Sequence, residues 1–379
     1  MQRSLAPFIR EDLSRKIILI SGPRQTGKTT LARMLGDRYD YLNFDVPEHR
    51  LSLVEQSWDR RKGYVIFDEL HKMRKWKVFL KGIYDGEGLS PGIVVTGSAK
   101  LNTYRKVGDS LAGRFFLFRL HPLDLHELAE QRQVQAGIEV TLDRLLNVGG
   151  FPEPFLHGTE RFYHRWRRSH LDVILRQDLP ALEHVQEITA IETLVQLLRK
   201  RVGSPISYSS LSRDLQCSDK TVKRWLSLLE SVYVIFKVSP HHRNIARSLT
   251  KAPKYYFFDT GLVIGDQGVR LENLVAGALL KRVQFAQDCL GKDLDLFYVR
   301  DKDGREVDFL VTLDEQPQML IEVKWSDDAP APAIAHFAPL LGVKRAVQLV
   351  RHLSRDKTFP TGLEIRHAAT WLSEIPLDT

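Results

Sequence analysis

Cysteine and long apolar runs are both scarce in this sequence. The 379 residues include only Cys217 and Cys289, which excludes a disulfide framework, and no C-x-x-C spacing is present for a zinc or redox site. No apolar run reaches the roughly 18–20 residues that a membrane span requires. The N-terminal residues lack the charged-then-apolar order of a signal peptide. We therefore expect a cytoplasmic protein that has no membrane partner.

The composition is that of a globular protein, with 43% hydrophobic and 27% charged residues. The chain is long enough for several domains that each bury a core. Its net charge is +8. The basic surplus lies in residues 1–270, whereas residues 271–379 are acidic on balance. A basic surplus in a cytosolic protein suits a polyanion, and DNA is the partner that we expect.

The first part of the chain has the pattern of an α/β domain. Short apolar runs alternate with polar or helical stretches, which predicts a parallel sheet covered by helices. We expect five strands, at residues 16–21, 39–45, 64–69, 92–98 and 114–120. This domain is expected to span 1–141, and the helical pattern of 142–200 predicts a small lid.

Residues 201–262 have the pattern of a winged helix-turn-helix. A helix at Ser207–Leu215 is followed by a turn and by a second helix, which Ser218 can cap. Apolar residues in the second helix fall on one face, at Val222, Trp225, Leu226 and Leu229. Runs at 233–238 and 254–259 are expected to form the wing strands.

The last segment, 263–379, is expected to form a separate α/β domain. A helix at 271–289 precedes three runs, 297–300, 306–311 and 319–325, that are separated by turn residues. Such spacing predicts an antiparallel three-stranded meander. A linker at 327–333 then leads into a final helix-and-strand region.

The sharpest motif is a complete phosphate-binding loop. The pattern G-x-x-x-x-G-K-[ST] occurs between a predicted strand and a predicted helix. Its backbone N–H groups can hold triphosphate oxygens, while the lysine reaches the outer phosphates and the last hydroxyl binds Mg²⁺. The loop and the start of its helix comprise Gly22, Pro23, Arg24, Gln25, Thr26, Gly27, Lys28, Thr29 and Thr30. ATP and Mg²⁺ are therefore the expected cofactors.

Four further residues are candidates for the chemistry of ATP hydrolysis. Asp68, at the end of a buried strand, is placed to orient the Mg²⁺ shell, and Glu69 to polarise the attacking water. Ser98 follows the fourth strand and is a candidate sensor of the outer phosphate; a plain turn serine is the alternative. Arg114 lies at the junction of a helix and the fifth strand. We expect it to act in trans on a neighbouring subunit, with a solvated strand-start residue as the alternative.

The chain resembles the AAA-type ATPases of bacteria and archaea whose P-loop domain is joined to a C-terminal restriction-endonuclease-like domain long of unknown function. The resemblance covers nearly the whole chain, through GPRQTGKTT, YVIFDELHK, VVTGSAK, SLAGRFFLFRLHPLDLHEL, GGFPE, APKYYFFDTGL, LENLV, EVDF and IEVK. It implies an AAA+ fold that binds nucleotide through Lys28, Thr29, Asp68 and Glu69. It also implies a homo-oligomer, either a hexameric ring or a smaller assembly, with Arg114 across the interface. The sequence does not distinguish a lid arginine among Arg161, Arg165, Arg167 and Arg168.

A second candidate site lies in the C-terminal segment. Glu322 and Lys324 are two residues apart on one predicted strand and so share a face, as do Glu306 and Asp308 on the preceding strand. Asp308 and Glu322 could hold Mg²⁺ beside Lys324, with Glu272 completing the group. This order is similar to the PD-(D/E)XK arrangement of metal-dependent nucleases. Alternating charged and apolar residues on ordinary strands are the alternative.

Two basic clusters are candidates for a DNA-binding surface, and a solvated charged face is the alternative for each. The first follows Glu69 directly and surrounds Trp76, with Lys72, Arg74, Lys75, Lys77 and Lys81. The second belongs to the winged helix, with Lys220, Lys223 and Arg224 on its second helix and Arg243, Arg247 and Lys251 in its wing.

These features predict an ATP-hydrolysing AAA+ protein that binds DNA and moves or remodels it. Branched DNA such as a Holliday junction is an analogy, drawn from the order of ATPase, lid and winged helix. One alternative is an ATP-gated, metal-dependent DNA nuclease. The other is a regulatory switch ATPase whose winged helix binds a protein.

Overall fold

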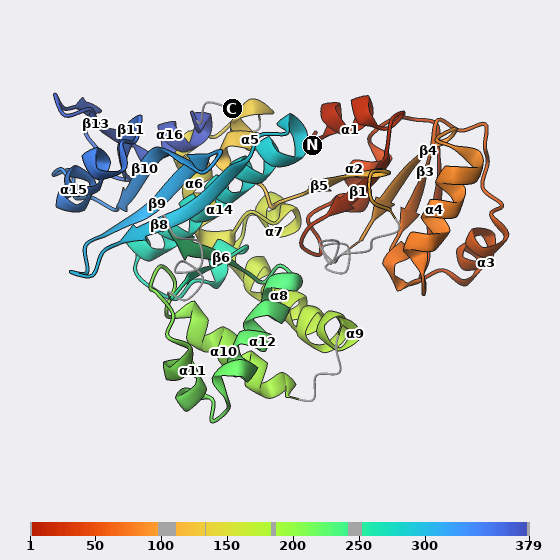
Figure 1. The fold of residues 1–379 in the computed structure, drawn as a ribbon, viewed down its shortest axis with the longest axis horizontal. Coiled ribbons are helices and arrows are strands. Elements are labelled where there is room, and N and C mark those ends of the chain that lie inside the picture. Colours follow the sequence, from red (N-terminus) through yellow and green to blue (C-terminus); the bar gives the residue numbers. More distant parts are fainter. Residues whose placement is uncertain (1, 98–110, 133, 183–186, 242–251, 377–379) are drawn as a thin grey trace. The chain divides into compact units, whose positions relative to one another are not determined.

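The computed structural model describes residues 2–97, 111–132, 134–182, 187–241 and 252–376. The chain divides into two compact units, each described here by itself (Figure 1). Unit 1 comprises Met1–His121 with Ser231–Tyr233, and unit 2 comprises Pro122–Glu230 with Val234–Thr379. No helix in the described part of the chain has the length and apolar character needed to cross a membrane.

Unit 1 is built on a parallel five-stranded sheet, as the alternating apolar runs predict. The strand order is β2-β3-β4-β1-β5, and every neighbouring pair is parallel. The five strands are β1 (Ile17–Ser21), β2 (Tyr39–Asn43), β3 (Tyr64–Asp68), β4 (Gly92–Thr96) and β5 (Phe115–Arg119). All residues of β1, β3 and β4 are buried, because helices cover both faces of the sheet.

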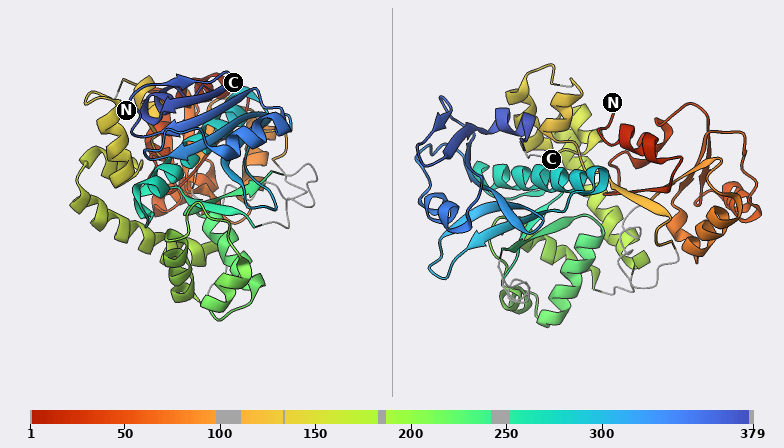
Figure 2. Two further views of the ribbon diagram at one scale, coloured as in Figure 1. Left: turned by 90° about the vertical axis from the view of Figure 1, so that its left-hand side faces the viewer. Right: turned by 45° about the horizontal axis from the view of Figure 1, so that its top comes forward.

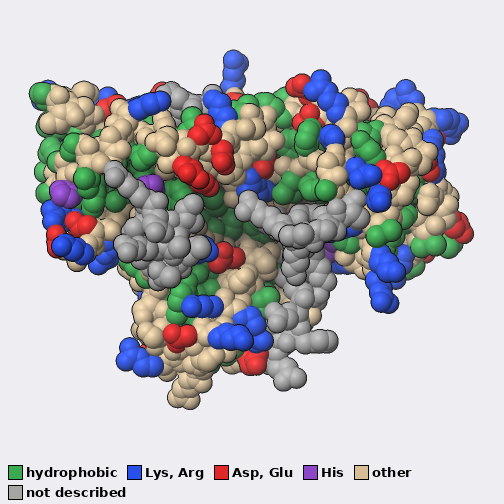
Figure 3. Space-filling model, viewed as in Figure 1, with side chains coloured by type: hydrophobic (Ala, Val, Ile, Leu, Met, Phe, Trp, Pro, Cys, Tyr) green, Lys and Arg blue, Asp and Glu red, His purple; other side chains and the backbone are tan. Residues whose placement is uncertain are grey.

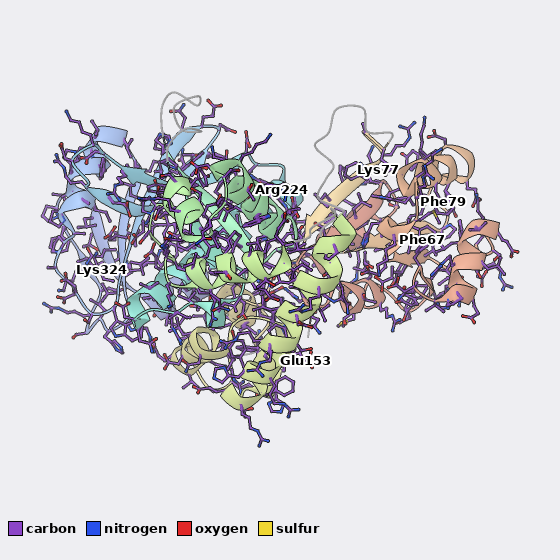
Figure 4. The ribbon with its side chains drawn as sticks, turned by 90° about the horizontal axis from the view of Figure 1, so that it is seen from below. Phe67, Lys77, Phe79, Glu153, Arg224 and Lys324 are labelled. Carbon is purple, nitrogen blue, oxygen red and sulfur yellow. The ribbon has the colours of Figure 1, made fainter. Side chains whose placement is uncertain are left out.

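The helices of unit 1 connect and cover these strands. They are α1 (Ala6–Asp12), α2 (Lys28–Arg33), α3 (Pro47–Glu55), the 3₁₀ turn η1 (Leu70–Lys72) and α4 (Trp76–Glu87). On one face, α4 packs Trp76 and Leu80 into a core with Phe67 of β3. Phe67 and Phe79, labelled in Figure 4, have ring centroids 6.2 Å apart. This packing fixes β3, the strand that carries Asp68 and leads into Glu69.

Unit 2 combines a helical region with a mixed sheet of eight strands. Its first helices are α5 (Leu125–Glu130), α6 (Ile138–Val148), α7 (Pro152–His157), α8 (Glu160–Val173), the π-helical turn η3 (Ile174–Asp178), α9 (Leu179–Leu182), α10 (Ile188–Arg199), α11 (Tyr208–Asp214) and α12 (Asp219–Ser231). Ser218 accepts a hydrogen bond from the Thr221 amide before α12, and the apolar face predicted for this helix is buried.

The sheet of unit 2 has the order β12-β13-β11-β10-β9-β8-β6-β7. Its strands are β6 (Ile235–Pro240), β7 (Lys254–Phe257), β8 (Leu294–Arg300), β9 (Glu306–Leu313), β10 (Gln316–Lys324), β11 (Arg345–Val350), β12 (Lys357–Thr358) and β13 (Leu363–His367). The predicted antiparallel meander is present as β8, β9 and β10. The remaining helical elements are the 3₁₀ turn η4 (Thr260–Leu262), α14 (Gln267–Leu290), α15 (Pro332–Leu341) and α16 (Ala368–Glu374).

Two helices hold this sheet. The long helix α14 lies along β8 and β10 (Figure 2), and α15 packs Ile334 and Phe337 on Leu310 and Leu320. At the edge strand β7, the side-chain amide of Asn273 accepts from the Phe257 N–H at 2.8 Å and donates to its carbonyl at 3.0 Å. This pair of bonds ties α14 to the strand that carries Lys254.

The strands expected as a wing are part of the C-terminal sheet. β6 and β7 are antiparallel, as predicted, but β6 also pairs in parallel with β8 through Ser239 and Pro240. The loop expected to carry the basic wing residues Arg243, Arg247 and Lys251 lies outside the described residues. The helices of residues 142–200, expected as a lid, lie within unit 2.

A buried hydrogen-bonded cluster connects the helical region of unit 2 to η4. The Tyr163 hydroxyl of α8 donates to Asp259 at 2.8 Å, and the Gly261 amide donates to the same carboxylate at 3.2 Å. A Cβ atom at Gly149 would lie 2.1 Å from the Asp259 carboxylate, so only glycine fits there. Burial raises the pKa of Asp259 to about 6, although Tyr163, Gly261 and nearby arginines favour the charged form.

The raised pKa of Asp259 predicts a pH-dependent stability. Because the folded-state pKa lies above the unfolded value, this group stabilises the fold most at low pH. Its contribution falls by about 1.4 kcal/mol per pH unit between roughly pH 4 and 6. Urea unfolding across this range should show the stability of wild type fall relative to that of Asp259→Asn as the pH rises. A difference that does not change with pH would contradict the assignment.

Candidate functional site

The phosphate loop occupies the turn between β1 and α2, as its motif predicts. The backbone has positive φ at Gly22, Gln25 and Gly27, and such changes of hand turn successive N–H groups toward one concave side. A Cβ atom at Gly22 would lie 2.2 Å from the Leu120 carbonyl oxygen, which explains the glycine there. Pro23 accepts from the Thr26 hydroxyl at 2.8 Å. The loop is therefore braced from within.

Lys28 points into the loop. Its ammonium donates to the carbonyls of Gly22 at 3.0 Å and Pro23 at 2.7 Å, and its side chain is largely buried. A phosphate oxygen placed in the loop would offer this ammonium a stronger, charged partner than a neutral carbonyl. Arg24 is half-buried, whereas Gln25 and Thr30 are exposed.

Asp68 is the hub of the site. Its carboxylate accepts from the Thr29 hydroxyl at 3.0 Å, from the Tyr41 hydroxyl at 2.7 Å and from the Thr96 hydroxyl. The Tyr41 and Thr96 hydroxyls come from the strands on either side of β3, and the Thr29 hydroxyl comes from α2. Thr29 and Asp68 supply a hydroxyl and a carboxylate oxygen side by side. Such hard oxygen ligands, together with nucleotide phosphates, are what Mg²⁺ requires. The donor set therefore fits Mg²⁺.

Glu69 follows β3 in a left-handed conformation, with φ of 55°. Its carboxylate lies 3.4 Å from the Lys72 ammonium and 3.6 Å from the His71 ring. Lys72 also pairs with Asp45 at 2.5 Å. Burial raises the pKa of Glu69, and Lys72 opposes that rise. A carboxylate with a raised pKa is a better base for the attacking water.

The two remaining catalytic candidates do not contribute to this cluster. Ser98 lies outside the described residues. Arg114 directly precedes β5 and therefore lies at the amino ends of the strands, whereas the phosphate loop follows the carboxyl end of β1. Its guanidinium pairs with both oxygens of Asp85, at 2.8 and 3.2 Å. Arg114 is thus remote from the phosphate loop of its own chain, and its role in trans stays a prediction.

Arg3 braces the phosphate loop and was not predicted from the sequence. Its buried guanidinium donates to the Thr26 carbonyl at 2.9 Å and to the His121 carbonyl at 2.5 Å. Arg10, one helix turn beyond the start of α1, donates to the carbonyls of Met34 and Leu35 just after α2. The N-terminal segment therefore holds both ends of the loop–helix unit. A lone arginine near a terminus carries no signal of this role.

Tyr41 and Thr96 were also missed. The register pairs Asp68 with Thr96 and with Asn43, so both neighbouring strands end beside the carboxylate. A hydroxyl residue in the middle or at the end of a strand was the available signal for each, but strand order was needed to place them beside Asp68.

The acidic residues predicted in the C-terminal segment do meet in the structure. Asp308 accepts from the Val323 amide at 2.9 Å, and Glu322 accepts from the Asp308 amide at 3.4 Å. Lys324, labelled in Figure 4, pairs with Glu322 at 2.8 Å. Glu272 of α14 joins them through Lys254, at 3.4 Å. Burial and the neighbouring Asp308 carboxylate raise the pKa values of Glu272 and Glu322.

The two basic clusters differ in how exposed their side chains are. On α12, Lys220, Lys223 and Arg224 are exposed; the Lys223 ammonium lies 4.9 Å from the Tyr208 ring centroid, and Arg224 is 3.6 Å from Glu187. Figure 3 shows Lys and Arg side chains, with a few acidic ones, over the region where Figure 1 draws α10 to α12. These three cations form an exposed face.

In the cluster after Glu69, Lys72, Arg74 and Lys75 are exposed, and Lys77 and Lys81 are half-buried. Trp76 is buried in the core of unit 1, so its ring is not available for stacking on a base. Lys72 is the residue of this cluster that directly contacts Glu69.

Comparisons with known families divide the chain into three segments. Residues 14–129 match the family described as AAA domain. Residues 139–270 and 267–365 match two families described as domains of unknown function (DUF8612 and DUF4143). The chain therefore carries an AAA-type P-loop domain, which confirms that part of the resemblance. The restriction-endonuclease-like character of the C-terminal part stays a prediction.

Two of the similar proteins are described as uncharacterised. An uncharacterised protein of Mycobacterium tuberculosis is 27% identical over 327 residues, which cover 83% of this chain and 72% of the relative. An uncharacterised protein of Haemophilus influenzae is 24% identical over 330 residues, covering 78% and 79%. Among solved structures, RuvB of Thermotoga maritima is 15% identical with a TM-score of 0.31, covering 62% of this chain and 86% of that one. A score at this level carries no argument about function.

The position of Arg3 predicts an effect on nucleotide affinity. Arg3→Ala removes two buried, charge-assisted hydrogen bonds, and we expect the Kd for ATP to rise by about tenfold or more. Arg3→Lys should restore part of the affinity. Isothermal titration calorimetry measures the change, with Arg15→Ala as the control, since Arg15 is exposed and pairs with its helix neighbours Glu11 and Asp12. Equal affinities for Arg3→Ala and wild type would show that the loop does not need this brace.

Proposed function

We propose that this protein hydrolyses ATP with Mg²⁺ and couples the hydrolysis to binding and remodelling DNA. The observation that carries the proposal is the double pairing of Lys72. Its exposed ammonium contacts Glu69, the residue assigned to the attacking water, and belongs to the basic cluster that follows β3. An external phosphate that binds Lys72 would change the charge beside Glu69. Binding of a polyanion is thereby connected to hydrolysis.

The chain's own residues divide the work of ATP hydrolysis. The loop amides and Lys28 hold the phosphates, and Arg3 keeps the loop in position. Thr29 and Asp68 would hold Mg²⁺, which supplies charge stabilisation to the phosphates when bound. Glu69 orients the water and accepts its proton. His71 and Lys72 lie beside the Glu69 carboxylate and position it.

DNA binding is assigned to two basic clusters: the exposed Lys220, Lys223 and Arg224 on α12, and the exposed Lys72, Arg74 and Lys75 with the half-buried Lys77 after Glu69. Phosphate contacts by lysine and arginine supply most of non-specific DNA affinity. We further propose a homo-oligomer, in which Arg114 exchanges Asp85 for the nucleotide of a neighbouring subunit. Branched DNA is the substrate to compare with duplex and single strands.

The assignment of the loop and Glu69 predicts two different losses. Lys28→Ala should abolish ATP binding, because the loop loses the buried ammonium that points into it. Glu69→Gln should bind ATP with nearly wild-type affinity but hydrolyse it at least about 100-fold more slowly, because the general base is lost. Equilibrium binding and single-turnover hydrolysis separate the two effects. Hydrolysis by Glu69→Gln at the wild-type rate would remove Glu69 from its role.

The basic face on α12 predicts a change in the salt dependence of DNA binding. For duplex DNA, log affinity falls against log salt with a slope of about −0.9 per phosphate contact. Replacing Lys220, Lys223 and Arg224 together by alanine should weaken binding and flatten the slope by up to about three units. ATP affinity should stay unchanged, since these residues lie outside the phosphate loop.

Fluorescence anisotropy at several salt concentrations measures the slope. Replacing Lys292, Lys302 and Lys344 of the acidic C-terminal segment is the charge-matched control, and it should leave the slope nearly unchanged. If the α12 variant kept the wild-type slope, its face would not be the DNA contact. That result would favour the alternative in which this region binds a protein.

A further inference from the structure

An internal ammonium occupies the acidic cluster of unit 2. Lys254 of β7 has a side chain that is 1% exposed. Its ammonium lies 2.7 Å from Glu306, 3.4 Å from Glu272 and 3.5 Å from Asp308. The lysine is held against the Tyr298 ring, whose centroid is 5.4 Å from the ammonium. These three carboxylates come from α14 and β9, and they converge on the one lysine.

The surrounding carboxylates also have other protein partners. Glu272 accepts from the Tyr256 hydroxyl at 2.7 Å, and Glu306 accepts from Arg300 at 2.9 Å. Asp308 accepts from the Val323 amide, and Glu322 pairs with Lys324. The cluster is therefore satisfied by donors that the chain itself supplies.

This donor arrangement does not fit the metal that a PD-(D/E)XK-like site would need. A divalent cation requires several oxygens converging on one empty position. Here the lysine ammonium lies at the point where Glu272 and Asp308 converge. Within the described residues, no group of three or more His, Cys, Asp or Glu side chains is arranged to hold a metal ion.

We propose that the ammonium of Lys254 takes the place of a divalent cation among Glu272, Glu306 and Asp308, so that the cluster is a metal-independent ionic lock joining α14, β7 and β9. A buried cation is tolerated only when it is paired with opposite charge, which the three carboxylates provide. Conversely, three carboxylates this close repel one another unless a cation lies between them. The lysine and the carboxylates therefore require each other.

The lock makes a specific prediction: removing the lysine uncovers a metal site. In Lys254→Met, a side chain of similar length but without charge leaves the carboxylates unneutralised. We expect the melting temperature to fall by about 10 °C without metal. Mn²⁺ should then bind between the carboxylates and raise the melting temperature by about 5–10 °C at 100-fold excess over its Kd.

The test uses the full chain without nucleotide. Mn²⁺ binding is followed by the loss of the free-ion electron paramagnetic resonance signal, and stability by thermal unfolding. Wild type should show no Mn²⁺ binding that depends on Asp308. Lys254→Met should bind one ion. The double variant Lys254→Met, Asp308→Asn should no longer bind it. Lys324→Met is the matched control, because Lys324 is more exposed than Lys254 and pairs with Glu322 at 2.8 Å.

Each outcome decides the proposal. Mn²⁺ that binds to wild type and is lost in Asp308→Asn would overturn it, because the lysine would then not exclude the metal. Failure of Lys254→Met to gain an ion would also overturn it, because the lysine would then not stand where a cation binds. Lys254→Gln, which keeps a polar group in the cluster, is the second variant if Lys254→Met does not fold, and the same gain is expected.

Discussion

The hydrogen bond between Thr29 and Asp68 connects the phosphate loop to the strand that carries Asp68 and leads into Glu69. It is 3.0 Å long and places a hydroxyl and a carboxylate oxygen side by side. The bond depends on the parallel sheet, which brings the ends of β1 and β3 to one edge with β4 between them. Tyr41 and Thr96 hold the same carboxylate from the neighbouring strands, and Arg3 holds the loop. The proposed chemistry of Glu69 relies on this arrangement.

Local patterns predicted much of the fold. The five parallel strands, the buried face of α12 and the β8–β10 meander follow from apolar periodicity and turn residues, which act over short stretches of chain. The joining of β6 to β8 could not be predicted, because it rests on two residue pairs, Ser239 with Phe297 and Pro240 with Tyr298, between segments distant in sequence. Periodicity carries no information about which strands become neighbours.

In the candidate site, too, local motifs could be predicted and contacts between distant segments could not. The phosphate loop and Asp68–Glu69 could be placed because a single contiguous motif specifies each of them. Arg3 and Lys254 could not, because each acts on a part of the chain far away in sequence. The sequence did contain one signal for Lys254: the lysine begins an apolar, aromatic stretch, where a buried charge needs partners. Only the tertiary structure shows that Glu272 and Asp308, which the sequence had suggested for a metal site, are two of those partners and that Glu306 is the third.

The two ionic systems have different consequences for function. At Glu69, the ammonium of Lys72 is exposed and can exchange its carboxylates for an external anion. At Asp308, the ammonium of Lys254 is buried and lies within ion-pair distance of three carboxylates. The first arrangement is suited to responding to a ligand, and the second to holding the sheet and α14 together.

The most direct test of the account is the rate of ATP hydrolysis measured without DNA and with duplex, single-stranded and four-way-junction DNA. If a DNA phosphate exchanges with Glu69 for Lys72, at least one form of DNA should increase the wild-type rate several-fold. High salt should abolish the increase, because the contact is electrostatic. A rate that is the same with every form of DNA as without it would contradict the proposed coupling.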